Sequence, residues 1–158
     1  MKRFFIAAII FCSGPASAQI DSTIKEKVSN FLNINFRRNS ADSVIDLCAF
    51  PFYTNDLTSK KYRFFSKAQF RAKLVAAYSK PENKFQQYKI ISIENNSCKD
   101  APAQFAGKVI CVNVKINFPS AGEGGSGADI DCIIFIQRNY PYKIMGVKQI
   151  QRVFRLRE

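Results

Sequence analysis

The sequence predicts an α+β domain in which a strongly curved antiparallel sheet wraps around three N-terminal helices. Apolar residues recur at helical spacing in the first half of the chain. From about residue 86 they alternate with polar residues, which is typical of strands. With 158 residues, 47% hydrophobic and 23% charged, the chain has room for about one packed domain and is too apolar to be disordered.

Residues 1–18 have the composition of a signal peptide. Two basic residues precede the apolar run 4–11, and residues 16–18 (Ala-Ser-Ala) supply the small side chains that signal peptidase accepts. The apolar run is shorter than the roughly 20 residues of a membrane-crossing helix, so no transmembrane segment is expected. We therefore expect a secreted or periplasmic protein whose mature chain, 19–158, is a single domain.

The first two helices are predicted before residue 50. One helix is expected over 23–37, where Thr23 and Glu26 have the spacing of a capping box. A short second helix is expected over 40–48, with Ser40 as its N-cap.

A third helix and two short strands are predicted in the middle of the chain. Ser66 and Gln69 form another capping-box pattern, and the helix is expected over 67–79. The aromatic-rich segments 50–53 and 62–65 are expected to be short strands.

The second half of the chain is predicted to form four strands. In the strand over 130–136 both faces are apolar, which predicts burial on both sides and favours a partner on the outer face. The expected strands cover residues 86–94, 107–118, 129–138 and 142–156.

Absent residue types exclude several kinds of chemistry. The chain has no His, so no imidazole can serve as a base, a triad member or a metal ligand. Four cysteines follow the signal peptide, but no two of them lie two to four residues apart, so no zinc site is expected. We expect neither a metal nor a cofactor.

The cysteine count favours an oxidising compartment and one or two disulfides. Cys98 lies in a polar loop and Cys111 in the strand that follows, so these two form the preferred pair. The fate of Cys48 and Cys132 stays open.

The mature chain is strongly basic. It keeps 22 Lys and Arg against 12 Asp and Glu, which gives a formal net charge of +10. In an exported protein this charge favours an anionic ligand, although a solvated basic surface explains it equally well. No aromatic residues interleave with the basic C-terminal residues, so nucleic acid is not expected as a partner.

The order of the elements resembles the nuclear transport factor 2-like superfamily, the cone-shaped fold that includes ketosteroid isomerase, scytalone dehydratase and polyketide cyclases. The resemblance covers about residues 21–156 and is supported by local phrases at 39–45, 130–135 and 142–147. It implies a pocket at the mouth of the cone. It also implies a homodimer through the outer sheet face, which the apolar strand over 130–136 independently favours.

The resemblance also implies catalytic positions. In the isomerase branch, a Tyr late in the first helix and an acid on a late strand hold an oxyanion, and an early acid moves a proton. Here the late acid matches Asp131 and the early acid matches Asp56, but Phe31 stands at the Tyr position. Phe has no hydroxyl to donate, and losing one such donor typically costs about 10² to 10³ in rate. Catalysis of this kind is therefore disfavoured.

Asp131 and the aromatic residues also have structural explanations. Asp131 sits between apolar neighbours, as many functional acids do, but a pocket rim or a contact with Lys115 would explain it as well. An aromatic cluster lines a ligand cavity less often than it forms a core. The pocket candidates are Phe31, Phe52, Tyr53, Phe64, Tyr78, Asp131 and Phe135.

These observations predict an exported small binding or interaction domain that is non-enzymatic and dimeric, and whose ligand, a small apolar or anionic molecule, the sequence does not identify. A first alternative is a pocket enzyme of the isomerase, dehydratase or cyclase kind that uses Asp131 and Asp56. A second alternative is a structural accessory of a cell-envelope complex with no small ligand.

Overall fold

The computed structural model describes residues 20–38, 40–55, 62–80, 87–119 and 127–155. The expected signal peptide and Asp56 lie outside these residues. The described helices are α1 (Ser22–Arg37), α2 (Ala41–Asp46) and α3 (Lys67–Tyr78), with a 3₁₀ turn at Ala103–Phe105. The described strands are β1 (Cys48–Asn55), β2 (Tyr62–Phe65), β3 (Lys89–Asn96), β4 (Val109–Phe118), β5 (Gly127–Gln137) and β6 (Ile144–Arg155).

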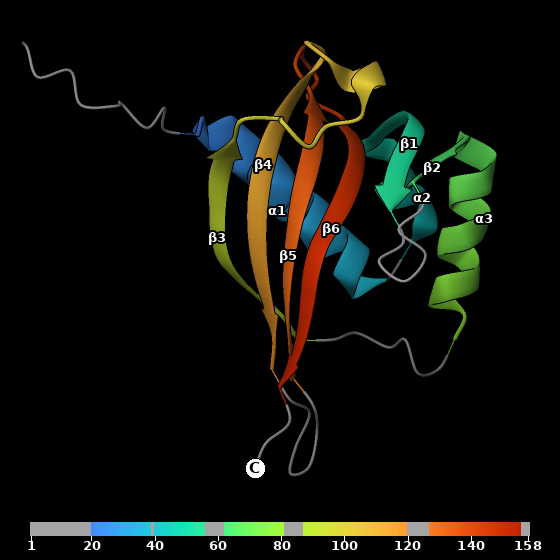
Figure 1. Ribbon diagram of the computed structural model, residues 1–158. Helices are drawn as coiled ribbons and strands as arrows, with labels where there is room; N and C mark the ends of the chain where they lie inside the picture. The colour runs from blue at the N-terminus through green and yellow to red at the C-terminus, as the bar shows by residue number, and fades with distance from the viewer. Residues whose placement is uncertain (1–19, 39, 56–61, 81–86, 120–126, 156–158) are drawn as a thin grey trace, which may run out of the picture.

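The six strands form one curved sheet in the order β2-β1-β6-β5-β4-β3 (Figure 1). All neighbouring pairs are antiparallel except β1 and β6, which run parallel. The prediction of an α+β fold with a curved sheet around three helices is confirmed, and the parallel pair is the departure from it. A parallel pair needs a long connection, and here most of the chain lies between its two strands.

Two of the three predicted N-caps are confirmed. The Ser40 side chain accepts from the Ser43 amide at 3.3 Å, and Ser66 and Gln69 form the predicted capping box. The N-cap predicted for the first helix, Thr23, was wrong by two residues. Asp21 is the N-cap, because its carboxylate accepts from the Thr23 amide at 2.9 Å.

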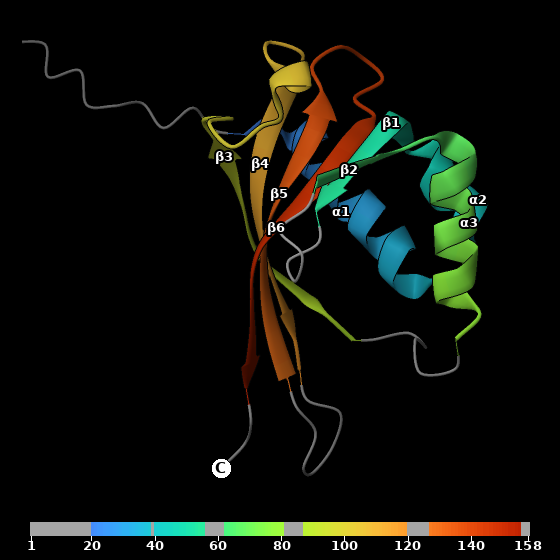
Figure 2. The same ribbon diagram turned by 45° about the vertical axis from the view of Figure 1, so that its right-hand side comes forward.

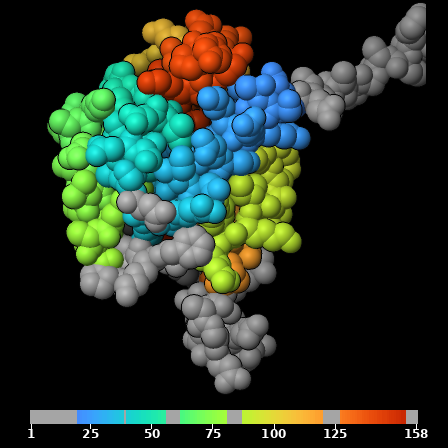
Figure 3. Space-filling view, turned by 180° about the vertical axis from the view of Figure 1, so that it is seen from behind, coloured from blue at the N-terminus to red at the C-terminus, as the bar shows by residue number. Residues whose placement is uncertain are grey.

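The helices cover one face of the sheet, which we call the inner face. Figure 2 and the view from behind in Figure 3 show α1 crossing this face, with α2 and α3 beside it. Residues of α1, α2 and α3 pack there against alternate residues of the strands, so this side holds the larger core. The buried core side chains include Val28, Phe31, Leu32, Val44, Phe52, Phe70, Leu74, Val112, Val114, Cys132, Ile134 and Ile136.

A second, smaller core lies on the opposite face of the sheet, which we call the outer face. There the connection between β3 and β4, residues 97–108, folds back over the strands (Figure 1). Its Phe105 packs against Ile133 and Phe135 of β5, both of which are fully buried. This core consists of Tyr53, Phe105, Val109, Cys111, Ile133 and Phe135.

The outer core explains why β5 is apolar on both faces. The sequence argument assigned the cover on the outer face to a partner subunit, but the chain's own residues 97–108 and Tyr53 supply it. The disulfide between Cys98 and Cys111 joins this connection to β4, and its prediction is confirmed. Cys48 and Cys132 are buried free thiols on the inner face.

Candidate functional site

A cleft of about 390 Å³ opens on the outer face, between the β1–β2 edge of the sheet and the connection 97–108. One wall is aromatic and is formed by side chains of β1 and β2. The other wall is polar and is formed by residues of the connection together with one lysine of β6. The described lining residues are Tyr53, Tyr62, Phe64, Lys99, Asp100, Ala101, Pro102, Gln104 and Lys148.

The floor of the cleft depends on a glycine. Gly146 of β6 lies opposite Tyr53 on one side and Phe135 on the other. Because Gly146 has no side chain, the rings of Tyr53 and Phe135 meet above it, with centroids 5.6 Å apart and planes at 75°. Phe105 completes the cluster, at 5.8 Å from Tyr53 and 5.5 Å from Phe135. Edge-to-face pairs at this separation are favourable, so Tyr53, which lines the cleft, rests on an apolar and closely packed layer.

The aromatic wall leaves two rings open to solvent. Tyr62 is 61% exposed and stacks on Tyr53, with centroids 5.8 Å apart and planes at 21°. Phe64 is 37% exposed and lies 5.3 Å from Tyr53. Large exposed rings beside a cleft are unusual on a monomer surface, and they offer a planar ligand an apolar platform.

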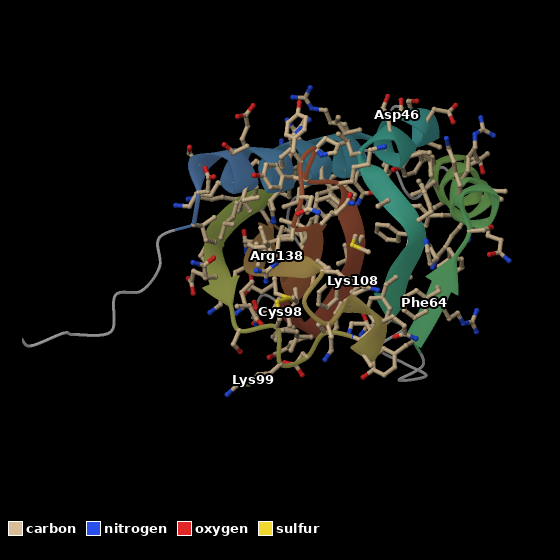
Figure 4. The ribbon with its side chains drawn as sticks, turned by 90° about the horizontal axis from the view of Figure 1, so that it is seen from above. Asp46, Phe64, Cys98, Lys99, Lys108 and Arg138 are labelled. Atoms are coloured by element: carbon tan, nitrogen blue, oxygen red, sulfur yellow. A yellow bond between two sulfur atoms is a disulfide. The ribbon has the colours of Figure 1, made fainter. Side chains whose placement is uncertain are left out.

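The polar wall contains an ion pair. Lys148 Nζ lies 3.1 Å from Asp100 Oδ1, and the lysine side chain is 18% exposed whereas the aspartate side chain is 60% exposed. Figure 4 shows Lys99 pointing outward from this wall, away from Phe64. Lys148 is therefore the cation held within the cleft, and Asp100 is its replaceable partner at the rim.

Local geometry fixes the connection that bears Asp100. The Cys98 amide donates to the Asn96 side-chain oxygen at 2.8 Å, and the Ala101 amide donates to the Cys98 carbonyl at 3.1 Å. Cys98 adopts a positive φ of 59°, which non-glycine residues rarely do without a structural reason. The disulfide to Cys111 supplies that reason, because it ties this turn to β4. The polar wall is thus pre-organised before any ligand arrives.

The protonation state of Tyr53 favours binding over acid–base chemistry. Burial, with a smaller contribution from Tyr62, raises the pKa of Tyr53 to about 12. At neutral pH the phenol therefore stays protonated and can only donate or accept a hydrogen bond. A general acid or base works best with a pKa near the working pH, which Tyr53 does not have.

A second cleft, of about 450 Å³, shares Ala101 and Pro102 with the first and reaches β3 and β4. Its charged group is Arg138, which also donates to the Val109 carbonyl at 3.4 Å. Its aromatic lining residue is Phe105, which is buried and offers no open ring face. This cleft is therefore the weaker candidate for a ring-shaped ligand.

The described residues show neither a metal site nor a membrane-crossing helix. No group of three or more Cys, Asp or Glu side chains within this part of the chain is placed to hold a metal ion. None of the described helices is both long enough and apolar enough to span a membrane.

Comparison with known proteins shows the fold of this chain. No family model matches the sequence, and no curated protein matches it. A solved protein of unknown function from Pseudomonas putida, described as nuclear transport factor 2-like, superposes with a TM-score of 0.62 at 10% identity, over 87% of this chain and 95% of that chain. The chain has the nuclear transport factor 2-like fold.

Two other solved structures agree with this assignment. A candidate aromatic ring hydroxylase from Novosphingobium aromaticivorans gives a TM-score of 0.60 at 8% identity, over 84% of this chain and 91% of that chain. A candidate ketosteroid isomerase from Parabacteroides distasonis gives a TM-score of 0.53 at 9% identity, over 77% of this chain and 83% of that chain. At such low identities the likeness concerns the nuclear transport factor 2-like fold alone.

The sheet divides the predicted pocket residues into two groups. Phe31, Phe52 and Tyr78 lie on the inner face, where the first two are buried in the main core. The Tyr78 hydroxyl donates to Asn35 Oδ1 of α1 at 3.1 Å, so it links α3 to α1. Tyr53, Phe64 and Phe135 come together on the outer face.

Asp131 belongs to neither group of aromatics. Its neighbours Ile130 and Cys132 pack into the inner core, so by strand alternation the Asp131 side chain is on the outer face. There it stands between Lys115 and Gln151, beyond the residues that line the cleft. The sheet separates Asp131 from Phe31, and Asp56 lies outside the described residues. The two acids of the enzyme alternative are therefore not brought together within the described structure.

Sequence reasoning missed the polar half of the site. Asp100, Gln104 and Lys148 are far apart in the sequence from β1 and β2, and they have no motif spacing. The available signal was the pairing of Cys98 with Cys111, because a disulfide there predicts an ordered connection. Tyr62 belongs to the aromatic-rich segment 62–65, but the sequence alone does not show which rings of that segment are exposed.

Proposed function

We propose that this chain is an exported, non-enzymatic protein that binds a small ligand in the outer cleft. The observation that supports the proposal most strongly is the combination of exposed rings at Tyr62 and Phe64 with the ion pair of Lys148 and Asp100 across one cleft. Apolar lining with a few fixed polar groups is typical of small-ligand sites, and a volume of about 390 Å³ lies within their usual range.

Export is part of this proposal. The leader-like residues 1–18 support it, and so does the disulfide of Cys98 and Cys111, since such bonds persist in oxidising compartments. Intact-mass analysis of the protein purified from a bacterial periplasm or culture medium should give a chain that begins at Gln19. Retention of residues 1–18 in that material would contradict the proposal.

The enzyme alternative has less support. The cleft offers a phenol with a high pKa, an ammonium, an amide and a paired carboxylate, and these groups orient a ligand rather than transfer its protons. The alternative needs Asp131 at the reacting atoms, yet Asp131 does not line the cleft.

The homodimer stays a prediction with a weaker basis. The apolar residues Ile133 and Phe135 are covered by the chain itself, so they no longer argue for a partner subunit. Beyond this core the outer face is mixed: Asn117 donates to Asp129 at 2.7 Å, while Val153, paired with Asp129, is 43% exposed. Core positions of subunit interfaces are usually depleted in such charges. Sedimentation of the mature protein at micromolar concentration decides this point.

A ligand panel tests the proposed function. The midpoint temperature of thermal unfolding of the mature chain, 19–158, should rise by several degrees with at least one small metabolite. Ligand at a hundredfold excess over Kd adds about 2.7 kcal/mol to the free energy of unfolding. The shift should be lost in Tyr62→Ala and kept in Tyr140→Ala, which removes another exposed ring away from the cleft. If no compound shifts the midpoint, the structural-accessory alternative is favoured.

A further inference from the structure

We propose that the ligand of the outer cleft is a small aromatic ring compound bearing one carboxylate, with its ring on Tyr62 and Phe64 and its carboxylate on Lys148. This inference rests on the proposed function, which makes the cleft a binding site. It goes further by stating the chemistry of the ligand and the way in which the ion pair opens.

The aromatic wall selects for a ring. Among the described aromatic side chains, Tyr62, Phe64 and Tyr140 are exposed, and two of these, Tyr62 with 61% and Phe64 with 37% of the surface exposed, lie at the cleft. Tyr53 beneath them is fully buried and fixes their position through ring contacts of 5.8 and 5.3 Å. A flat ring can cover these open faces in an offset stack, and aliphatic chains would lose that contribution.

The charges of the lining residues select for an anion. Lys99 and Lys148 against Asp100 leave a formal charge of +1 at the cleft, on a mature chain whose formal net charge is +10. Lys99 points outward, so it attracts an approaching anion only at long range. Lys148 is therefore the lysine that can contact a bound anion directly. One carboxylate is therefore the complement of this site.

The ion pair of Lys148 and Asp100 can exchange the Asp100 carboxylate for that of a ligand. Lys148 is the more buried partner at 18% exposure, while Asp100 at 60% exposure has water as an alternative partner. The pair is exposed on its Asp100 side, where water can solvate the released carboxylate, so releasing Asp100 is inexpensive. A ligand carboxylate held beside the apolar floor meets Lys148 in a drier environment, where the attraction is stronger. The ligand thus replaces Asp100 at Lys148 Nζ.

Matched ligands test the charge without any mutation. Calorimetric titration of the mature protein compares 2-naphthoate with 2-naphthamide, which keeps the ring and lacks the charge. We expect naphthoate to bind at least about tenfold more tightly, because the amide keeps a carbonyl acceptor but loses the ionic attraction to the Lys148 ammonium. Equal affinities for the two compounds would overturn the assignment.

Three variants test the residues. Lys148→Met should weaken naphthoate binding at least about tenfold, while Lys115→Met, which removes an exposed lysine from the same face outside the cleft, should leave it unchanged. Asp100→Asn should strengthen binding, because the competing carboxylate is gone. Weaker binding in Asp100→Asn, or equal losses in the two lysine variants, would contradict the exchange mechanism.

The failures of the two proposals are distinguishable. If a panel compound binds in a Tyr62-dependent manner but naphthoate does not bind, the ligand class is wrong and the proposed function stands. If no compound depends on Tyr62 or Lys148, the cleft itself is not the binding site, and both proposals fail.

Discussion

Gly146 and Tyr53 approach each other so closely that any side chain at position 146 would force β1 to shift. A Cβ added to Gly146 would lie 2.6 Å from the Tyr53 carbonyl oxygen and 2.7 Å from the Tyr53 Cβ. The two residues are partners in the parallel pairing of β1 with β6. This contact lets the Tyr53 ring reach across β6 to Phe135 and form the floor of the outer cleft.

Gly146→Ala should therefore destabilise the protein and, at the same time, displace Tyr53 at the floor of the cleft. The clash is with backbone as well as side-chain atoms, so β1 must shift, and overpacking of this kind costs about 1–3 kcal/mol of the free energy of unfolding. Urea unfolding at equilibrium measures this loss, and ultraviolet titration of tyrosine should show fewer phenols ionising at about 12 than in the unaltered protein, where both Tyr53 and Tyr78 do so.

Gly107→Ala is the matched control for that substitution. Gly107 has a φ of +70°, but a Cβ there would have nothing within 4 Å. Its cost is limited to the strain of a left-handed residue, about 1–2 kcal/mol, and the Tyr53 titration should not change. If Gly146→Ala proves as stable as the unaltered protein, the close packing of β1 on β6 is wrong.

Reduction of the disulfide should lower the free energy of unfolding by about 3 kcal/mol. Cys98 and Cys111 are 13 residues apart, and closing a loop of about this length restricts the unfolded chain by that amount. Unfolding in urea with and without a reductant measures the difference. The variant Cys48→Ala with Cys132→Ala keeps this disulfide and should show the same loss, and absence of the loss would contradict the pairing.

The two free thiols should be unreactive in the folded protein. Cys48 and Cys132 are buried, and burial raises the pKa of each thiol to about 12. Since the thiolate is the reactive form, a disulfide reagent at neutral pH should find no thiol in the native mature chain and two after denaturation. Rapid labelling of either cysteine under native conditions would show that the inner core is open.

The folded state should lose stability as the pH rises from about 9 to about 12. Unfolded thiols ionise near 9.0, whereas the folded thiols keep their protons until about 12. The unfolded state then binds fewer protons, so its relative free energy falls. At about pH 10.5 each buried thiol lowers the free energy of unfolding by about 2 kcal/mol relative to neutral pH. The variant without Cys48 and Cys132 should therefore lose less stability over this pH range. A flat profile would contradict burial of these groups.

Most elements of the fold could be predicted from the sequence, because their signals are local. Alternation of Val112, Val114 and Ile116 located β4, and the Ser66 and Gln69 spacing located the start of α3. Cys98 and Cys111 could be paired because few residues separate them and their elements are adjacent.

The partners across the sheet could not be predicted in the same way. Alternation tells which face a side chain is on, and it does not tell what covers that face. Ile133 and Phe135 therefore indicated a second buried face correctly, but their cover was assigned to another subunit rather than to Phe105. The parallel pairing of β1 with β6 was missed because it joins segments about 90 residues apart.

The candidate site was predicted only by half. Tyr53 and Phe64 were among the candidates and do line the outer cleft, while Phe31 and Phe52 belong to the inner core. Aromatic composition alone does not separate these two environments. Lys148 was visible only as one of the basic C-terminal residues, since nothing in its sequence neighbourhood indicates that it faces a cleft.

The most direct test is an amide NMR titration of the nitrogen-15-labelled mature chain with 2-naphthoate. The account predicts that the largest chemical-shift changes fall on Tyr53, Tyr62, Phe64, Asp100 and Lys148, which line the outer cleft. Changes centred instead on Phe31 and Phe52 of the inner core, or on Arg138 of the second cleft, would contradict it.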